Sequence, residues 1–227
     1  LALTRNTDDR GRAQAIEHWK QAADTALGMS QDARARELFE RAQKLDPNDL
    51  EIARALTEIL SRYEEWGEVL PLYDVLLAHA PSTAAKVELL VTVVGIREER
   101  LTDPAGALDA AAMAFSLAPT AHNVLLLFER VAAQAGALSR FAAEIDQALD
   151  KGLDPHTASE VRLAKARVLA RDPQFRDTVI ETYRRILETP GADDSRVDTA
   201  ATALEEMLES PRAGLEKSTR RWLSEWK

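Results

Sequence analysis

Acidic side chains occur as adjacent pairs at several points, and two carboxylates are the simplest set that could supply a general acid and a general base. Four of these pairs are Glu64–Glu65, Glu98–Glu99, Asp193–Asp194 and Glu205–Glu206. Neighbouring residues of a helix point about 100° apart, so no pair forms an acid–base couple by itself. We expect the third pair to favour a helix N-terminus through the helix dipole, and the other pairs to lie on solvated faces.

Histidine and cysteine, the other common catalytic and metal-binding residues, give no constellation. The four histidines are scattered and have no ligand partners nearby in the sequence, and there is no cysteine. The sequence contains no Gly-rich phosphate loop, no HExxH and no Gly-x-Ser-x-Gly turn. It therefore predicts no catalytic residues, no metal site and no cofactor, and an enzyme is the least favoured class.

The charge balance weighs against a nucleic-acid partner. The net charge is −9 and the isoelectric point about 5.1, whereas phosphate binding needs a basic surface. The longest nearly apolar run, VELLVTVVGI (87–96), is too short to span a bilayer. Twenty-two arginines against seven lysines suggest a bacterial source. Because the sequence begins with Leu1, we expect a fragment of a longer or processed chain. The expected location is the cytoplasm, with the periplasm as the alternative, since the lack of cysteine is compatible with both.

Prolines recur at Pro47, Pro81, Pro119, Pro155 and Pro190, at intervals of 34, 38, 36 and 35 residues. A fixed period of this length is typical of a solenoid of helix pairs. Ahead of four of these prolines, small or large apolar residues recur at helical spacing. These residues are Ala35, Phe39 and Ala42; Val69, Tyr73 and Leu76; Ala107, Ala111 and Ala114; and Val179, Tyr183 and Ile186. The segment 141–149 fits the pattern most loosely.

Helix boundaries are marked by capping residues. Thr120, Asp154, Asp172 and Ser210 can each accept a hydrogen bond from a free N–H at a helix start. No alternation of apolar and polar residues lasts long enough to predict a strand. The sequence therefore predicts an all-α protein of about twelve helices.

The repeat resembles the tetratricopeptide repeat (TPR). That family has an early tryptophan and small residues in the first helix, then an alanine–aromatic–alanine pattern and a closing proline in the second. The first unit matches closely, at Trp19, Ala23, Ala35, Phe39, Ala42 and Pro47. The second matches in part, and the third is four residues longer, which lengthens the helix that ends in 97–103. The segment 35–42 also suits half-a-TPR repeats of RNA-processing scaffolds, although the acidic balance weighs against that variant.

The resemblance implies a right-handed superhelical solenoid in which the first helix of each pair lines the concave face. We expect a polar lead-in at 1–11, five helix hairpins over 12–190, a closing helix pair at 191–227, and no separate second domain.

An apolar strip is expected on the concave face. Leu90, Val91 and Val94 are expected to pack against the hairpin partner, which leaves a second stripe for a partner helix or extended segment. This stripe consists of Leu89, Val93, Ile96 and Leu127. The alternative is that tight curvature buries the same residues against neighbouring repeats.

Polar residues on first helices are a second set of candidate partner contacts, namely Arg54, Arg62, Asn123 and Arg130. Some members of the family clamp a peptide's terminal carboxylate with basic and asparagine side chains, but here the bases alternate with acids. At the end of the chain, Trp222 and Trp226 lie four residues apart on one helical face. They either cover the last apolar face of the solenoid or dock onto another repeat or subunit.

The function that these features predict is a non-catalytic scaffold that binds a protein or peptide on its concave face. The alternative is a regulatory or assembly domain of a larger, possibly catalytic protein, acting through self-association or subunit docking. No insertion into a membrane is expected.

Overall fold

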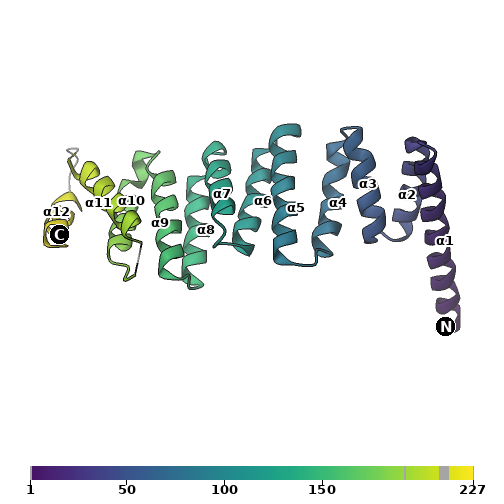
Figure 1. Ribbon diagram of the computed structural model, residues 1–227, viewed down its shortest axis with the longest axis horizontal. Coiled ribbons are helices and arrows are strands. Elements are labelled where there is room, and N and C mark those ends of the chain that lie inside the picture. The colour runs from purple at the N-terminus through teal and green to yellow at the C-terminus, as the bar shows by residue number, and fades with distance from the viewer. Residues whose placement is uncertain (1, 192, 210–214, 227) are drawn as a thin grey trace. The chain divides into compact units, whose positions relative to one another are not determined.

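The computed structural model of the 227-residue chain describes residues 2–191, 193–209 and 215–226, which form helices and loops without a strand. Twelve α-helices follow one another in this described part (Figure 1). They are α1 (Ala2–Gly28), α2 (Asp32–Leu45), α3 (Leu50–Arg62), α4 (Trp66–Ala78), α5 (Thr83–Gly95), α6 (Pro104–Leu117), α7 (His122–Gln134), α8 (Leu138–Asp150), α9 (Pro155–Leu169), α10 (Arg176–Leu187), α11 (Asp194–Glu209) and α12 (Leu215–Trp226). A π-helical segment, η1 (Ile96–Arg100), extends α5, and a 3₁₀ turn, η2 (Pro173–Phe175), precedes α10.

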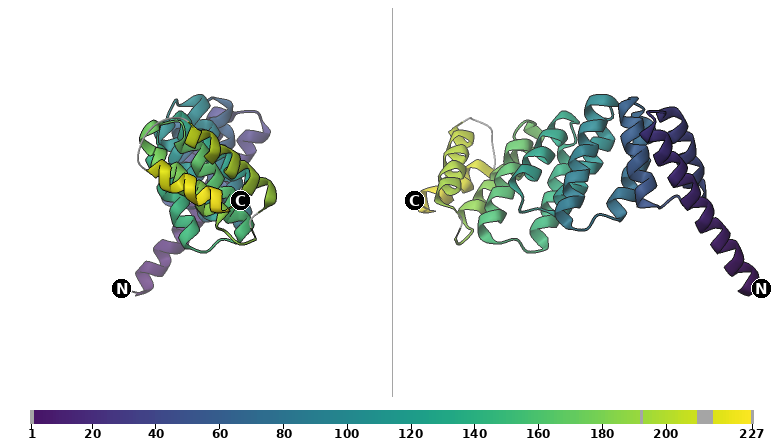
Figure 2. Two further views of the ribbon diagram at one scale, coloured as in Figure 1. Left: turned by 90° about the vertical axis from the view of Figure 1, so that its left-hand side faces the viewer. Right: turned by 45° about the vertical axis from the view of Figure 1, so that its right-hand side comes forward.

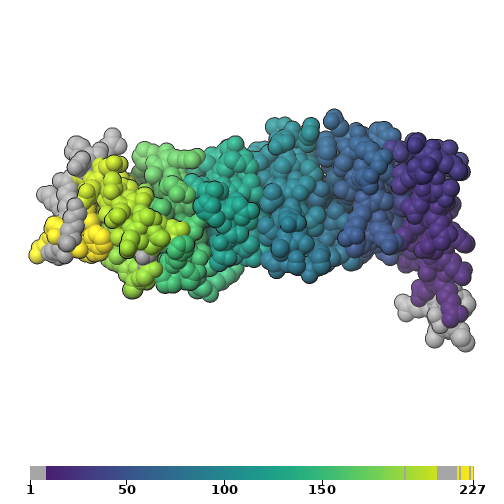
Figure 3. All heavy atoms as spheres, viewed as in Figure 1, coloured from purple at the N-terminus to yellow at the C-terminus, as the bar shows by residue number. Residues whose placement is uncertain are grey.

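The helices divide into two compact units, of which the first ends at Asp103 and the second begins at Pro104. In the first unit α1 packs on α2, α2 on α3, α3 on α4, and α4 on α5. In the second unit each helix from α6 to α10 likewise packs on its successor, and α9 also contacts α7 and α11. Because the main contacts join helices one or two places apart in the chain, each unit is an all-α solenoid. Within each unit, the residues follow chain order across the surface in Figure 3.

The boundary between the two units falls at 103/104 in the sequence, a position that was not among the predicted boundaries. Residues 2–11, expected as a lead-in, belong to α1, which has 27 residues against 14 in α2 and extends beyond it (Figure 2). The right-handed superhelix and the range of five repeats over 12–190 stay predictions.

The repeat positions of the second helices form the core of both units. All of the residues named above for these positions are buried except Leu76, which is half-buried. The fourth repeat follows the same spacing at Phe141, Ile145 and Ala148, which are also buried. The first position of each repeat therefore falls at Ala35, Val69, Ala107, Phe141 and Val179, at alternating intervals of 34 and 38 residues. This register was hidden in the sequence because the proline of the fourth repeat lies further along.

The longer repeats place their extra residues between the two helices of a pair. In one of them α5 continues into η1, which confirms the predicted lengthening of the helix that ends in 97–103. In the other, η2 separates α9 from α10. A π-helical turn, although rare, adds residues to a helix without ending it.

Three of the predicted caps can be compared with the structure. The side chains of Asp154 and Asp172 accept backbone N–H hydrogen bonds at 3.0 Å, which confirms both. The prediction for Thr120 is wrong, because α7 begins one residue later, after Ala121, which cannot cap with its side chain. The fourth predicted cap, Ser210, lies outside the described residues.

Three turns within helix pairs share one hydrogen-bonding pattern. Ser30, Glu64 and Gly136 follow α1, α3 and α7 with positive φ angles of 56°, 58° and 65°. The next residue donates its N–H to the carbonyl oxygen five residues back, at 2.9–3.0 Å in all three turns. This is the Schellman C-cap, where glycine is preferred because a Cβ is strained at positive φ.

Replacing Glu64 with glycine is therefore expected to raise the free energy of unfolding by up to about 1 kcal/mol, since the side chain is exposed. Gly136→Ala is expected to lower it by a similar amount. No atom lies within 4 Å of a Cβ built on Gly136, so only the backbone opposes that change. Urea unfolding measures both, and equal stability of Gly136→Ala and wild type would contradict the argument.

Asp49 caps α3 and also ties it to α1. Its Oδ1 accepts hydrogen bonds from the N–H groups of Glu51 at 2.8 Å and Ile52 at 3.0 Å, and its Oδ2 accepts one from Lys20 Nζ at 3.2 Å. Burial by itself would raise the pKa of Asp49, but the hydrogen bonds from Ile52 and Lys20 outweigh it and hold the pKa below its ordinary value.

A carboxylate whose pKa falls on folding stabilises the fold above its unfolded pKa of about 4, and this stabilisation is lost as the pH drops through the folded value. We expect Asp49→Asn to lower the melting temperature by a constant amount above about pH 5, and by a shrinking amount below about pH 4. Asparagine is also a good cap, so the change removes the charge more than the cap. A difference that stays constant down to pH 2 would show that the Asp49 carboxylate does not contribute through its charge.

Candidate functional site

Consecutive first helices are joined by ion pairs in several places. In the first unit Lys20 on α1 contacts Asp49 and Glu51 at the start of α3. In the second unit Arg167 Nη2 on α9 lies 2.7 Å from Glu129 Oε2 on α7. Farther along the same face, Arg196 Nη2 on α11 lies 3.2 Å from Glu160 Oε2 on α9, and Glu160 also contacts His122 on α7.

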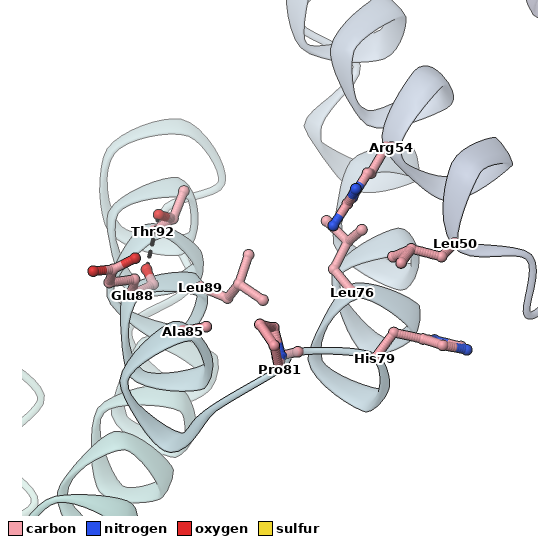
Figure 4. A pocket seen from close by; sticks show the side chains of 10 residues that line it. Leu50, Arg54, Leu76, His79, Pro81, Ala85, Glu88, Leu89 and Thr92 are labelled. Carbon is pink, nitrogen blue, oxygen red and sulfur yellow. Dashed lines mark hydrogen bonds between the residues drawn. The ribbon is translucent and has the colours of Figure 1, made fainter.

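Helices α3 and α5 depart from this arrangement. Among the residues that the structure describes, no ion pair joins them, and a cavity of about 370 Å³ opens between them over the end of α4 (Figure 4). Its lining consists of Leu50, Arg54, Leu76, His79, Ala80, Pro81, Ala85, Glu88, Leu89 and Thr92. All of these residues belong to the first unit.

Two well-defined helix starts set the base of the cavity. The cap at Asp49 places Leu50 as the first residue of α3. Ser82 Oγ accepts the N–H of Ala85 at 3.1 Å, so α5 begins directly after the bend that contains Pro81. Proline has no N–H to donate and disfavours a helical conformation in the residue before it, so Pro81 suits the bend that separates α4 from α5.

The orientation of α5 decides which side chains reach the cavity. Leu90, Val93 and Val94 are buried on one side of the helix, and Glu88 and Thr92 lie on the opposite side, beside the cavity. At the edges between the two sides, Leu89 lines the cavity and Val91 is 39% exposed. Val91, which was expected to pack against the hairpin partner, is therefore more exposed than Leu90 and Val94.

The predicted apolar strip is only partly accessible. Val93 and Ile96 are each 7% exposed, so for these two residues the alternative of burial holds. The reason is helical phase: Val93 follows Leu90 by three positions and shares its buried side, and Ile96 begins the π-helical turn. Leu89 is half-buried in the cavity, and Leu127 is half-buried on α7 in the second unit.

Arg54 is the one predicted charged residue in this cavity. Its guanidinium and the Glu88 carboxylate have no hydrogen-bond or ion-pair partner among the described residues. In Figure 4 Leu89 points from α5 toward Pro81, Arg54 extends from α3 in front of α4, and Glu88 points to the other side of α5. The polar groups of the cavity do not converge on one point. Its apolar lining includes Leu50 from α3, Leu76 from α4 and Leu89 from α5.

The other predicted polar contacts lie elsewhere. Arg62 is engaged by Asp32 at 2.8 Å and Glu58 at 2.7 Å. Asn123 and Arg130 are exposed on α7, where Arg130 donates to Gln134 at 2.9 Å.

The terminal tryptophans differ in environment. Trp222 packs against the apolar core of the second unit, with the Arg184 guanidinium 4.8 Å above its ring. Trp226 is 40% exposed. The position of Trp222 is the one expected when a terminal helix covers the last apolar face of a solenoid.

Leu50, Leu76, Glu88 and Thr92 were not among the predicted site residues. The proline period and the helix starts locate the bend before α5, but which faces of α3 and α5 confront each other depends on helix phase. No group of His, Asp and Glu side chains suited to hold a metal ion occurs in the described residues. None of the described helices combines the length and apolar character needed to cross a membrane.

The fold and the buried repeat positions define this chain as a helix-hairpin solenoid that resembles TPR proteins. No family model matches the sequence, and neither does any curated protein. Among solved structures, it is similar to TTC0263, a thermophilic TPR protein of Thermus thermophilus, with 22% identity, a TM-score of 0.37, and coverage of 83% of this chain and 98% of the other.

Two further solved structures are similar at the same level. YrrB, a TPR protein with an unusual peptide-binding site, has 15% identity, a TM-score of 0.36, and coverage of 83% and 96%. PilF of Pseudomonas aeruginosa has 16% identity, a TM-score of 0.35, and coverage of 94% and 90%. These likenesses assign no function to this chain, whose repeat character rests on its own sequence and core.

Proposed function

We propose that this chain is a non-catalytic interaction scaffold that binds a segment of a partner protein in the cavity between α3 and α5. The observation that carries the proposal is the open gap between these first helices, floored by Leu50, Leu76 and Leu89, where other first helices are joined by ion pairs. In the predicted superhelix this is the concave face.

The chemistry of the lining favours a polypeptide over a metabolite. Small-molecule sites combine an apolar wall with polar groups that converge on the ligand. Here the side chains of Arg54 and Glu88 point in different directions, and the apolar lining lies in an open cavity between α3 and α5. Such a surface suits the apolar side chains of an amphipathic helix or an extended segment, with Arg54 available to an acidic residue beside them.

The test is affinity capture from a native lysate with the whole chain and with two single-residue variants. The substituted positions are two residues apart on α5. Leu89→Asp places a charge in the cavity, and Val91→Asp places the same charge on the exposed opposite edge of α5. We expect Leu89→Asp to weaken capture of a specific partner by at least about tenfold, and Val91→Asp to leave it unchanged.

Circular dichroism of both variants shows whether the helices are intact. A partner that Leu89→Asp captures as well as wild type would contradict the proposed site, and so would equal losses for the two variants. Arg54→Glu serves as a second variant at an exposed position, where unfolding is not expected.

A further inference from the structure

The second unit contains a different cavity, of about 620 Å³, between the end of α8, the middle of α9 and one face of α10. Only one apolar side chain, Leu149, lines it. The others are Asp146, Asp150, Arg162, Lys165, Asp177, Thr178, Glu181, Thr182 and Arg185. A polar lining of this kind does not suit the apolar segment proposed for the first unit.

Two of the carboxylates in this cavity are already neutralised. Lys165 Nζ lies 2.7 Å from both carboxylate oxygens of Asp146. Glu181 accepts a hydrogen bond from Arg185 Nε at 3.2 Å and also contacts Arg184 at 3.6 Å. Neither carboxylate is free to pair with the remaining cation, Arg162.

Arg162 is half-buried and held in place without a carboxylate partner. Its Nη1 donates to Thr189 Oγ1 at 3.0 Å, and the Thr189 hydroxyl in turn donates to the carbonyl oxygen of Arg185. The Nε and Nη2 edge of the guanidinium has no partner among the described residues. Burial, followed by the charge of Arg185, lowers the pKa of Arg162, and the charge of Asp146 opposes this only in part.

We propose that the cavity binds a small oxyanion, a carboxylate or a phosphate, through the free edge of Arg162. A guanidinium edge presents two parallel N–H donors that match two oxygens of either group. The negative charge of the bound anion offsets the repulsion between Arg162 and Arg185 and the desolvation of Arg162.

The rim of the cavity restricts which anions fit. Asp150 at the end of α8 and Asp177 in the first turn of α10 are exposed and add negative charge there. Because these carboxylates repel further negative charge, they disfavour a polyanion such as nucleic acid more strongly than a molecule with a single anionic group.

The test follows the Nε–H resonance of Arg162 in the ¹⁵N-labelled whole chain during titration with acetate and, separately, with inorganic phosphate. Sodium chloride at equal ionic strength is the control for screening. We expect a saturable shift with at least one oxyanion and no saturable shift with chloride. Saturation by acetate alone assigns a carboxylate ligand, and saturation by phosphate alone assigns a phosphate ligand.

Two variants complete the test. Arg162→Lys keeps the charge but loses the paired donors, and we expect at least about tenfold weaker binding. Arg140→Lys changes an exposed arginine of α8 that pairs with Asp109, and it is expected to leave binding unchanged. No saturable shift, an equal shift with chloride, or equal binding by folded Arg162→Lys would overturn the proposal. If Arg162→Lys does not fold, the wild-type titration against chloride decides alone.

Discussion

Replacing Phe128 with alanine is expected to lower the free energy of unfolding by about 3–5 kcal/mol. Phe128 is fully buried on α7. Its ring centroid lies 5.4 Å from that of Phe115 on α6 and 4.8 Å from that of Phe141 on α8. Truncation removes the apolar transfer energy, both ring contacts and the filling of the central space among three helices.

Urea unfolding followed by circular dichroism measures this change. Leu126→Ala is the matched control, because Leu126 lies on the same helix and is 44% exposed. It is expected to cost less than about 1 kcal/mol. A loss for Phe128→Ala no larger than that of the control would mean that the three rings are not packed as described.

Replacing Asp146 with alanine is expected to lower the free energy of unfolding by about 2 kcal/mol. The reason is Lys165, whose side chain is only 10% exposed and whose ammonium group has both Asp146 oxygens as partners at 2.7 Å. Without Asp146 a charge remains in a nearly buried position with two hydrogen bonds lost. Because the Asp146 side chain itself is 52% exposed, the cost stays below that of a fully buried pair.

Two controls separate this loss from general effects. Asp150→Ala removes a carboxylate one turn later on α8 for which no ion pair is formed by the described residues, and it is expected to be neutral within about 0.5 kcal/mol. Lys165→Met removes the charge together with the need to neutralise it, so Asp146→Ala should cost far less in that background. Equal losses with Lys165 and with Met at this position would rule out the ion pair as the cause.

Much of the fold could be predicted because the same residue pattern occurs in several repeats. Small or aromatic residues at fixed spacing bury one stripe of each second helix, and Ala35 and Val179 serve the same position in different repeats. The fourth repeat was harder to recognise, because its closing proline is displaced although Phe141 keeps the spacing. The division into two units has no counterpart in the proline period.

The candidate site could be predicted only in part, and helix phase is the reason. Leu89 and Arg54 were expected at a binding surface, and both line the cavity. For Val93 the alternative of burial holds. The sequence left both alternatives open, because an apolar helix such as 87–96 does not reveal which of its stripes is buried. The cavity between α3 and α5 exists because side chains of these two helices do not contact each other there. No residue spacing in the sequence predicts this.

The central claim is that a partner segment lies in the cavity between α3 and α5, and photocrosslinking tests it most directly. A benzophenone amino acid is placed at Thr92, which is exposed and lines the cavity, or at Val91, which is exposed on the other edge of the same helix. After incubation with the partner captured from lysate, we predict a crosslink from position 92 to one short segment of that partner, and none from position 91. A crosslink from position 91 with none from position 92 would contradict the account.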